Sequence, residues 1–321
     1  MPTAALAFAV DVGAPRWAGH ADIGSGESAP QPRGLAALPD GSVLIACADD
    51  TDSKLLRLPD PRCGLRGRAA CAPPQRWASA GLAHPYGLAL DTSAAAAGRG
   101  LIFVSNQDSG VVTAYDVMMI RNNESMPTGV YDGVRTSYGS KPGALDLRGV
   151  AARAGRLYVA AEARDAVYVH DASTGVLLGA IAVRAPIALA LDATTGDLLI
   201  GSNEDARLVA YRWRESAGRV VREYVCDSAA CGGHAAGVAV RTDARASASA
   251  CDPTRRHRAP PPQLSPDGTA LFVLGQNSGV LVQFNASDGA VLGTVLTGLR
   301  RPQQLLLLPA DAPAGGSVPP E

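Results

Sequence analysis

Apolar and polar positions follow one another along this chain in a short cycle that begins six times. Each cycle opens on a nearly continuous apolar phrase, which predicts an innermost strand buried on both faces. The six copies are anchored on Gly34, Gly87, Gly149, Ala188, Gly237 and Gln304. Without insertions the spacing is about 40 residues, a period typical of four-stranded repeat units. The pattern therefore predicts an array of similar supersecondary units.

Further short strands follow each opening phrase. We expect second strands at residues 43–48, 101–106, 157–162, 198–203 and 271–277. Third strands are expected at 110–116, 166–171, 207–213 and 280–285, and fourth strands at 175–183 and 290–296. Polar turns with Gly, Asp, Asn and Ser separate them. Four antiparallel strands per unit predict an all-β fold, a β-propeller with one blade per cycle.

The recurring motif resembles the NHL and YVTN families of β-propellers. It reads Pro-x-Gly-Leu-Ala-x-Asp, then Gly-x-Leu-Tyr-Val-Ala/Ser, then x-Val-x-x-Tyr-Asp, and it extends from about Pro32 to Pro309. Two copies depart from it, with Ala188 and Gln304 in place of Gly, and the third and fifth copies lack the Pro. The resemblance and the six copies together predict a six-bladed propeller.

The two ends of the chain fit a closed ring. Ala5–Val12 and Arg16–Ile23 match third and outermost strands, and Gln303–Leu308 matches an innermost one. Residues 1–30 and 299–321 would then build the sixth blade together and remove the open edge of the array. One strand of that blade is missing from the pattern, so the blade is incomplete or the chain is part of a longer one.

The whole chain, residues 1–321, is thus expected to form a single propeller domain with two insertions. The first, near 117–141, mixes apolar and polar residues, and we expect it to be partly ordered and to cap one end of the central channel. The second, near 241–263, has no apolar periodicity and is expected to be a solvated loop.

The charge balance narrows the choice of partner. Lys and Arg number 29 against 30 Asp and Glu, a net charge of −1. A neutral chain has no overall field that attracts nucleic acid or anionic lipid. DNA is therefore not an expected partner, and RNA would need a basic face of which there is little sign. No apolar stretch is long enough for a membrane span, and the N-terminal MPTAALAFAV lacks the basic region of a signal peptide, so a strand is expected there.

Six cysteines and two sequons bear on the compartment. Cys47 lies within an apolar strand and is expected to be a buried, inert thiol. The pairs Cys63–Cys71 and Cys226–Cys231 are close enough in sequence for local disulfides, and neither has the two-residue spacing of zinc ligands; Cys251 lies in the second insertion. Asn123 and Asn285 begin glycosylation sequons. The compartment stays open, although these features favour a secreted or lumenal glycoprotein over a cytoplasmic protein.

The candidate site is the mouth, the end of the ring at which the innermost strands begin. The residues that open these strands are Gln31, His84, Asp146, Ala185, His234 and Arg301. Two positions further on stand Arg33, Tyr86, Arg148, Ile187, Ala236 and Gln303. Polar and cationic residues are concentrated here, although a solvated mouth carries polar residues without any function. We expect the ligand-binding residues to be Gln31, Arg33, Tyr86, Arg148, Arg301 and Gln303.

Two functions fit this mouth. The preferred one is a binding or interaction module, without cofactor, that recognises a peptide, a protein or a small anionic ligand. Arg33, Arg148 and Arg301 would face one opening, and water, Asp146 or the anionic partner would screen their repulsion.

The alternative is a metal-dependent lyase or hydrolase, as the resemblance to propeller lactonases and amidating lyases implies. His84, Asp146 and His234 would be catalytic, with His84 and His234 also ligands of a channel-bound zinc or calcium. His84 and Asp146 would form a base and its orienting carboxylate. Asp146 is the sole carboxylate of the two rings, which weighs against the enzyme.

Overall fold

The computed structural model describes residues 31–49, 51–61, 72–91, 100–117, 146–192, 196–202, 270–274, 281–285 and 290–296. It also describes the backbone of strands within residues 4–22, 127–131, 207–214, 217–225, 239–241 and 262–264. Nearly all regular structure in these parts is β-strand.

Four sheets share one antiparallel strand order, from an innermost to an outermost strand in sequence. Blade 1 contains β5 (Pro32–Ala37), β6 (Val43–Cys47), β7 (Lys54–Leu58) and β8 (Gln75–Ala78). Blade 2 contains β9 (Pro85–Asp91), β10 (Leu101–Asn106), β11 (Val111–Asp116) and β12 (Pro127–Tyr131). Blade 3 contains β13 (Leu147–Arg153), β14 (Arg156–Ala161), β15 (Ala166–Asp171) and β16 (Leu177–Ala182). Blade 4 contains β17 (Pro186–Leu191), β18 (Leu198–Ser202), β19 (Arg207–Arg214) and β20 (Ala217–Val225).

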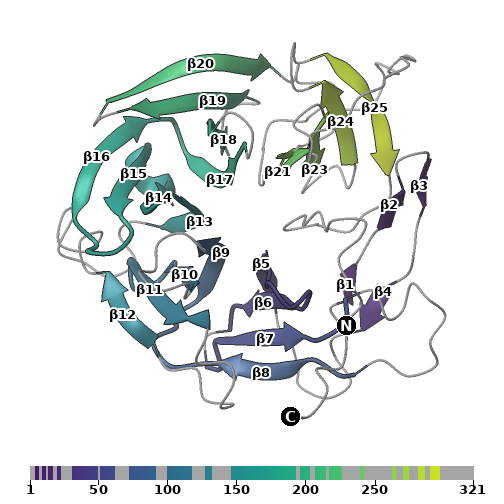
Figure 1. Cartoon of the computed structure of the whole chain (residues 1–321), viewed down its shortest axis with the longest axis vertical. Coiled ribbons are helices and arrows are strands. Elements are labelled where there is room, and N and C mark those ends of the chain that lie inside the picture. The colour runs from purple at the N-terminus through teal and green to yellow at the C-terminus, as the bar shows by residue number, and fades with distance from the viewer. Residues whose placement is uncertain are drawn as a thin grey trace.

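A fifth sheet and an N-terminal hairpin continue the ring (Figure 1). The sheet contains β21 (Ala239–Arg241), β22 (Pro262–Leu264), β23 (Ala270–Leu274), β24 (Leu281–Asn285) and β25 (Val291–Leu296). The hairpin pairs β1 (Ala4–Leu6) with β4 (His20–Asp22) and β2 (Ala9–Asp11) with β3 (Ala14–Arg16). The two N-terminal segments thus pair as expected. Gln303–Leu308 lies outside the described residues, so the closure by both termini and the count of six blades stay predictions.

The structure adds strands that the sequence pattern did not indicate. The outermost strands β8, β12 and β20 complete blades 1, 2 and 4. Strand β12 lies inside the first predicted insertion, so part of 117–141 belongs to a blade and pairs with β11. Strand β22 lies at the end of the second predicted insertion and pairs with β21 and β23. The rest of both segments lies outside the described residues.

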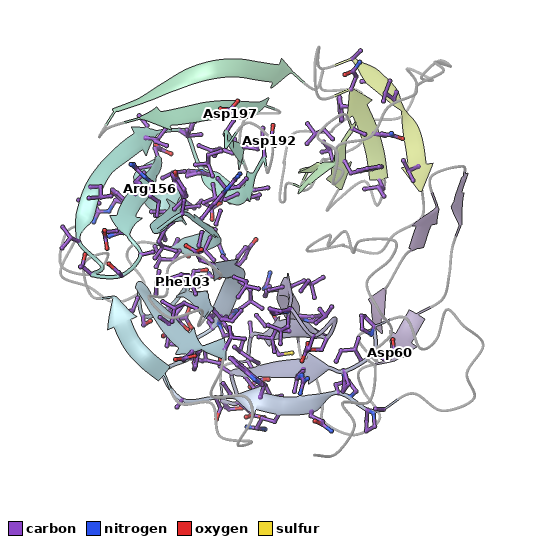
Figure 2. The ribbon with its side chains drawn as sticks, viewed as in Figure 1. Asp60, Phe103, Arg156, Asp192 and Asp197 are labelled. Atoms are coloured by element: carbon purple, nitrogen blue, oxygen red, sulfur yellow. The ribbon has the colours of Figure 1, made fainter. Side chains whose placement is uncertain are left out.

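The core is divided among the interfaces between successive blades. One apolar cluster joins blade 1 to blade 2, a second joins blade 2 to blade 3, and a third joins blade 3 to blade 4. Phe103 of β10 is fully buried and packs in the second cluster, where Figure 2 labels it. The middle strands are sandwiched between neighbouring sheets, which explains why β6 and β18 are buried at every position. Burial on both faces is the physical reason for their continuous apolar sequence.

Candidate functional site

In blades 1 to 4, the residue directly before the innermost strand has a left-handed backbone. The φ angles are 52° at Gln31, 54° at His84, 49° at Asp146 and 40° at Ala185. This conformation costs a residue other than Gly about 1 kcal/mol or more, so surrounding bonds must stabilise it. The carbonyl oxygens of three of these residues accept the N–H of the residue after the second strand, at 3.1 Å from Ala48, 3.1 Å from Gln107 and 3.3 Å from Glu162.

A β-bulge follows at the same place in all four blades. The pairing register with the second strand shifts between Pro32 and Leu35, between Pro85 and Leu88, between Leu147 and Val150, and between Pro186 and Ala188. Each bulge contains the residue two positions after the left-handed one, namely Arg33, Tyr86, Arg148 or Ile187. Bulges re-aim a side chain and are frequent at sites of function. The two rings inferred from the sequence are therefore structurally equivalent positions in the four described blades.

Bonds between blades hold the left-handed residues in place. Ser53, the last residue before β7, accepts the N–H of His84 at 3.1 Å through its hydroxyl oxygen. Asp165, the last residue before β15, accepts the N–H of Ala185 at 2.8 Å through its carboxylate. Both acceptors directly precede the third strand of their blade. The same hydrogen bond therefore positions the start of the next innermost strand between blades 1 and 2 and between blades 3 and 4.

The anchoring Gly of the apolar phrase marks the closest approach of neighbouring innermost strands. A Cβ on Gly87 would lie 2.8 Å from the Arg148 carbonyl oxygen and 2.8 Å from the Val150 nitrogen. A Cβ on Gly149 would lie 2.9 Å from both the Ile187 oxygen and the Leu189 nitrogen. The buried Ser105 hydroxyl adds a bridge here, because it accepts the N–H of Gly87 at 2.9 Å and donates to the Arg148 carbonyl.

Three bulge side chains from three successive blades meet at the mouth. The guanidinium carbon of Arg33 lies over the Tyr86 ring, 5.7 Å from its centroid, and that of Arg148 lies over the same ring at 4.9 Å. Both distances are within the range of cation–π attraction. Arg33 also donates to the Gln31 side-chain oxygen at 2.9 Å. We call Arg33, Tyr86 and Arg148 the bulge trio.

Two carboxylates neutralise Arg148. Its Nε donates to Glu162 at 2.5 Å, and its terminal nitrogens donate to Asp146 at 3.3 Å and to the Gln107 side chain at 2.6 Å. Only 17% of the Arg148 side chain and 14% of the Glu162 side chain are exposed, so the pair is held in a poorly solvated place. Of the mouth arginines, Arg33 and Arg148 lie within the described residues, and the charge of Arg148 is screened from within the chain by Asp146, as one of the expected alternatives, and more closely by Glu162.

The pKa values reflect these surroundings. Burial lowers the pKa of Arg33, and the neighbouring Arg148 adds to this although Tyr86 acts in the opposite direction. Burial also pulls the pKa of Arg148 down, but Tyr86, Glu162 and Asp146 outweigh it and the pKa is raised. Burial raises the pKa of the Tyr86 hydroxyl, against the effect of Arg148 and Arg33. The trio therefore consists of two cations and a neutral phenol at neutral pH.

His84 lies beside a different carboxylate from the one expected. Its Nδ1 is 3.4 Å from Asp108 Oδ2, in the turn after the second strand of its own blade. Asp146, the expected orienting partner, contacts Arg148 in β13, the strand that it directly precedes. His234, Arg301 and Gln303 lie outside the described residues. Within the described part of the chain, no group of three or more His, Cys, Asp or Glu residues is arranged to hold a metal ion.

Sequence reasoning missed Glu162, Gln107 and Asp108 because it considered only the innermost strands. A signal was present, since antiparallel pairing places the end of each second strand beside the start of the first. Glu162 directly follows β14, and its N–H bonds to Asp146 accordingly. Elsewhere, the expectation for Cys47 is confirmed: it is a buried free thiol whose pKa burial raises to about 12. The other five cysteines lie outside the described residues.

The part of the chain that the structure describes contains no helix long and apolar enough to cross a membrane. No family model matches the chain, and no curated protein matches it.

Solved structures do match. A candidate 6-phosphogluconolactonase from Bacteroides uniformis superposes with a TM-score of 0.57 at 14% identity, over 89% of this chain and 77% of that one. A chain of a nidogen/laminin complex gives 0.54 at 15% identity, over 87% and 88%. A functionally unknown protein from Desulfotomaculum acetoxidans gives 0.54 at 12% identity, over 90% and 77%. At these identities the likeness concerns the fold alone, and it shows that this chain is a β-propeller.

Proposed function

We propose that this propeller is a binding module that recognises an acidic peptide, a protein segment or a small anion at its mouth. The observation that carries the proposal is the bulge trio, which brings two guanidinium groups onto one aromatic ring from three successive blades. Arg, Tyr and Trp are the residues that most often dominate binding interfaces. Arg301 and Gln303 complete the proposed ligand-binding set with Gln31 and the trio.

Arg33 and Tyr86 are the members of the trio that we assign to the ligand. Arg148 is held by Glu162, Asp146 and Gln107, so its charge is matched inside the protein. Arg33 and Tyr86 are partly exposed, and Gln31 beside them is exposed. A guanidinium with an adjacent amide suits the two oxygens of a carboxylate, which bind Arg as a fork.

The test measures affinity for a fluorescein-labelled oligoglutamate peptide by fluorescence anisotropy. We expect Arg33→Gln and Tyr86→Leu each to weaken binding at least tenfold, and more strongly at low salt because the attraction is screened by ions. Arg57→Gln is the matched control, since Arg57 lies in the same blade and pairs with Asp40 in the turn after β5, at the end remote from the mouth. Equal affinity in the two mouth variants and wild type would overturn the proposal.

The alternative remains a metal-dependent lyase or hydrolase using His84, Asp146 and His234. The structural neighbours include a candidate 6-phosphogluconolactonase, which is compatible with the enzyme alternative. They also include a chain of a nidogen/laminin complex, which is compatible with the binding module. A metal assay on purified protein separates the two. Stoichiometric zinc or calcium that is lost in His84→Ala would favour the enzyme.

Three further assignments belong to this proposal. The chain is a single domain over residues 1–321, it has six blades with the last one closed by both termini, and its repeats are of the NHL/YVTN type. The apolar phrase with its bulge and its close-approach glycine supports the repeat assignment. A secreted or lumenal location, with disulfides and glycans, rests on Cys63, Cys71, Cys226, Cys231 and the two sequons.

A further inference from the structure

The residue directly after the second strand of each blade forms a third ring of equivalent positions at the mouth. In blades 1, 2 and 3 these residues are Ala48, Gln107 and Glu162, and their N–H groups bond to the carbonyl oxygens of the residues that precede the innermost strands. Two of the three side chains reach Arg148: Gln107 accepts from its Nη1 at 2.6 Å, and Glu162 accepts from its Nε at 2.5 Å. The third ring is therefore part of the surroundings of the bulge trio.

The two arginines of the trio differ in the side chains that their own blades place at the neighbouring ring positions. In blade 3 both positions carry a carboxylate that pairs with Arg148: Asp146 precedes the innermost strand, and Glu162 follows the second strand. In blade 1, the blade of Arg33, the same two positions carry uncharged side chains, Gln31 and Ala48. At these equivalent positions, the negative charge is thus concentrated around one arginine of the two.

This arrangement limits the charge that a ligand can bring to the mouth. Each of the three nitrogens of Arg148 already donates to a side-chain oxygen of the protein, and two of the three acceptors are carboxylates. Only 17% of the Arg148 side chain and 14% of the Glu162 side chain are exposed, so little water screens their charges. A singly charged anion can pair with Arg33. A second negative charge on the ligand would meet two carboxylates and an arginine whose charge they already match.

We propose that the mouth selects a carboxylate over a phosphate, and that Glu162 is the residue that determines this specificity. The proposal rests on the binding function proposed above and names the group that Arg33 and Tyr86 recognise, a carboxylate with a single negative charge. A phosphate monoester carries a charge of about −1.5 to −2 near neutral pH, so the buried carboxylate of Glu162 repels it more strongly. Repulsion of the wrong ligand is one of the two ways in which a site gains specificity.

Fluorescence anisotropy with two fluorescein-labelled peptides of equal length, an oligoglutamate and an oligophosphoserine, tests this. Attraction by charge alone would favour the oligophosphoserine, which carries more negative charge. We expect the opposite order, with the wild-type protein binding the oligoglutamate at least tenfold more tightly. In Glu162→Gln this ratio of affinities should fall at least tenfold, because a neutral amide no longer repels the second charge. A purely structural role of Glu162 would weaken the binding of both peptides alike and leave the ratio unchanged.

Asp165→Asn is the matched control, since it removes the same charge in the same blade from a carboxylate that binds the Ala185 N–H, and it should leave the ratio unchanged. Thermal melting shows whether each variant folds. If Glu162→Gln does not, Asp146→Asn takes its place and should also lower the ratio, because Asn tolerates the left-handed backbone of that position.

The outcomes separate this proposal from the binding function on which it rests. Wild-type protein that binds the oligophosphoserine as tightly as the oligoglutamate overturns the carboxylate specificity and leaves the binding function standing. A ratio that the folded carboxylate variants leave at the wild-type value overturns the role of Glu162 in the same way. Protein that binds neither peptide overturns the binding function, and this proposal with it.

Discussion

Replacing Gly87 by alanine should destabilise the interface between blades 2 and 3. The new Cβ would lie 2.8 Å from two backbone atoms of β13, the Arg148 oxygen and the Val150 nitrogen, and 3.0 Å from the Gly149 Cα. Ordinary contact requires about 3.4 Å, so the two innermost strands would have to separate by roughly 0.6 Å. Neither atom can rotate away, because both belong to the backbone of a paired strand.

Overpacking of this kind costs about 1–3 kcal/mol. The separation would also weaken the Ser105 bridge between the two strands, worth about 1 kcal/mol. The lower entropy of alanine in the unfolded chain returns about 0.4–1 kcal/mol. We therefore expect a net loss of about 1–3 kcal/mol in the free energy of unfolding, and a fall in the melting temperature of about 2–5 °C.

Urea unfolding followed by tryptophan fluorescence measures the change, since Trp77 packs on Tyr115 in the neighbouring core. Ala188→Gly is the control, because blade 4 already carries a Cβ at the equivalent position, and removing it should change stability by less than about 1 kcal/mol. If Gly87→Ala unfolds within about 0.5 kcal/mol of wild type, the close approach does not explain the glycine.

Other predictions concern a blade-to-blade bond, a titrating histidine and the thiols. Asp165→Ala should lower the free energy of unfolding by about 1–2 kcal/mol, because the Ala185 N–H loses its acceptor. Asp165→Asn keeps an acceptor oxygen and should retain most of the wild-type stability, and thermal melting of the two variants measures the difference. Burial lowers the pKa of His170 despite its bond to the Gly175 carbonyl. The unfolded chain therefore binds the extra proton more tightly than the folded chain does. The stability contributed by neutral His170 should be fully present above about pH 6.5 and be lost as the pH falls below it. His170→Asn should reduce that slope in unfolding curves between about pH 7 and 5, and an unchanged slope would exclude His170 as its source. Cys47 should resist iodoacetamide at pH 8 in the folded protein, given its raised pKa, and rapid labelling would contradict its burial. Mass spectrometry without reductant on protein from its native source should find Cys63 joined to Cys71 and Cys226 to Cys231, and free thiols at all six positions would indicate a reducing compartment.

The sequence alone was sufficient to predict the all-β propeller class. A strand buried on both faces must be apolar at nearly every position, and a tight turn needs Gly, Asp or Asn, so the cycle of phrases such as His84–Asp91 predicts strand order directly. The equivalence of Arg33, Tyr86 and Arg148 also followed from alignment of the repeats, and the identical bulges confirm it. The short outermost strands β8 and β12 did not follow, because a rim strand buries one face at most and leaves a weak pattern.

Only the tertiary structure decided which charges meet at the mouth. The expected partner of His84 was Asp146, but Asp108 lies beside it and Asp146 joins Glu162 around Arg148. These contacts depend on how far each bulge turns a side chain and on how closely two blades approach, and neither quantity is encoded in residue spacing. The repeat determines that equivalent positions share a ring; the packing between blades determines which of them touch.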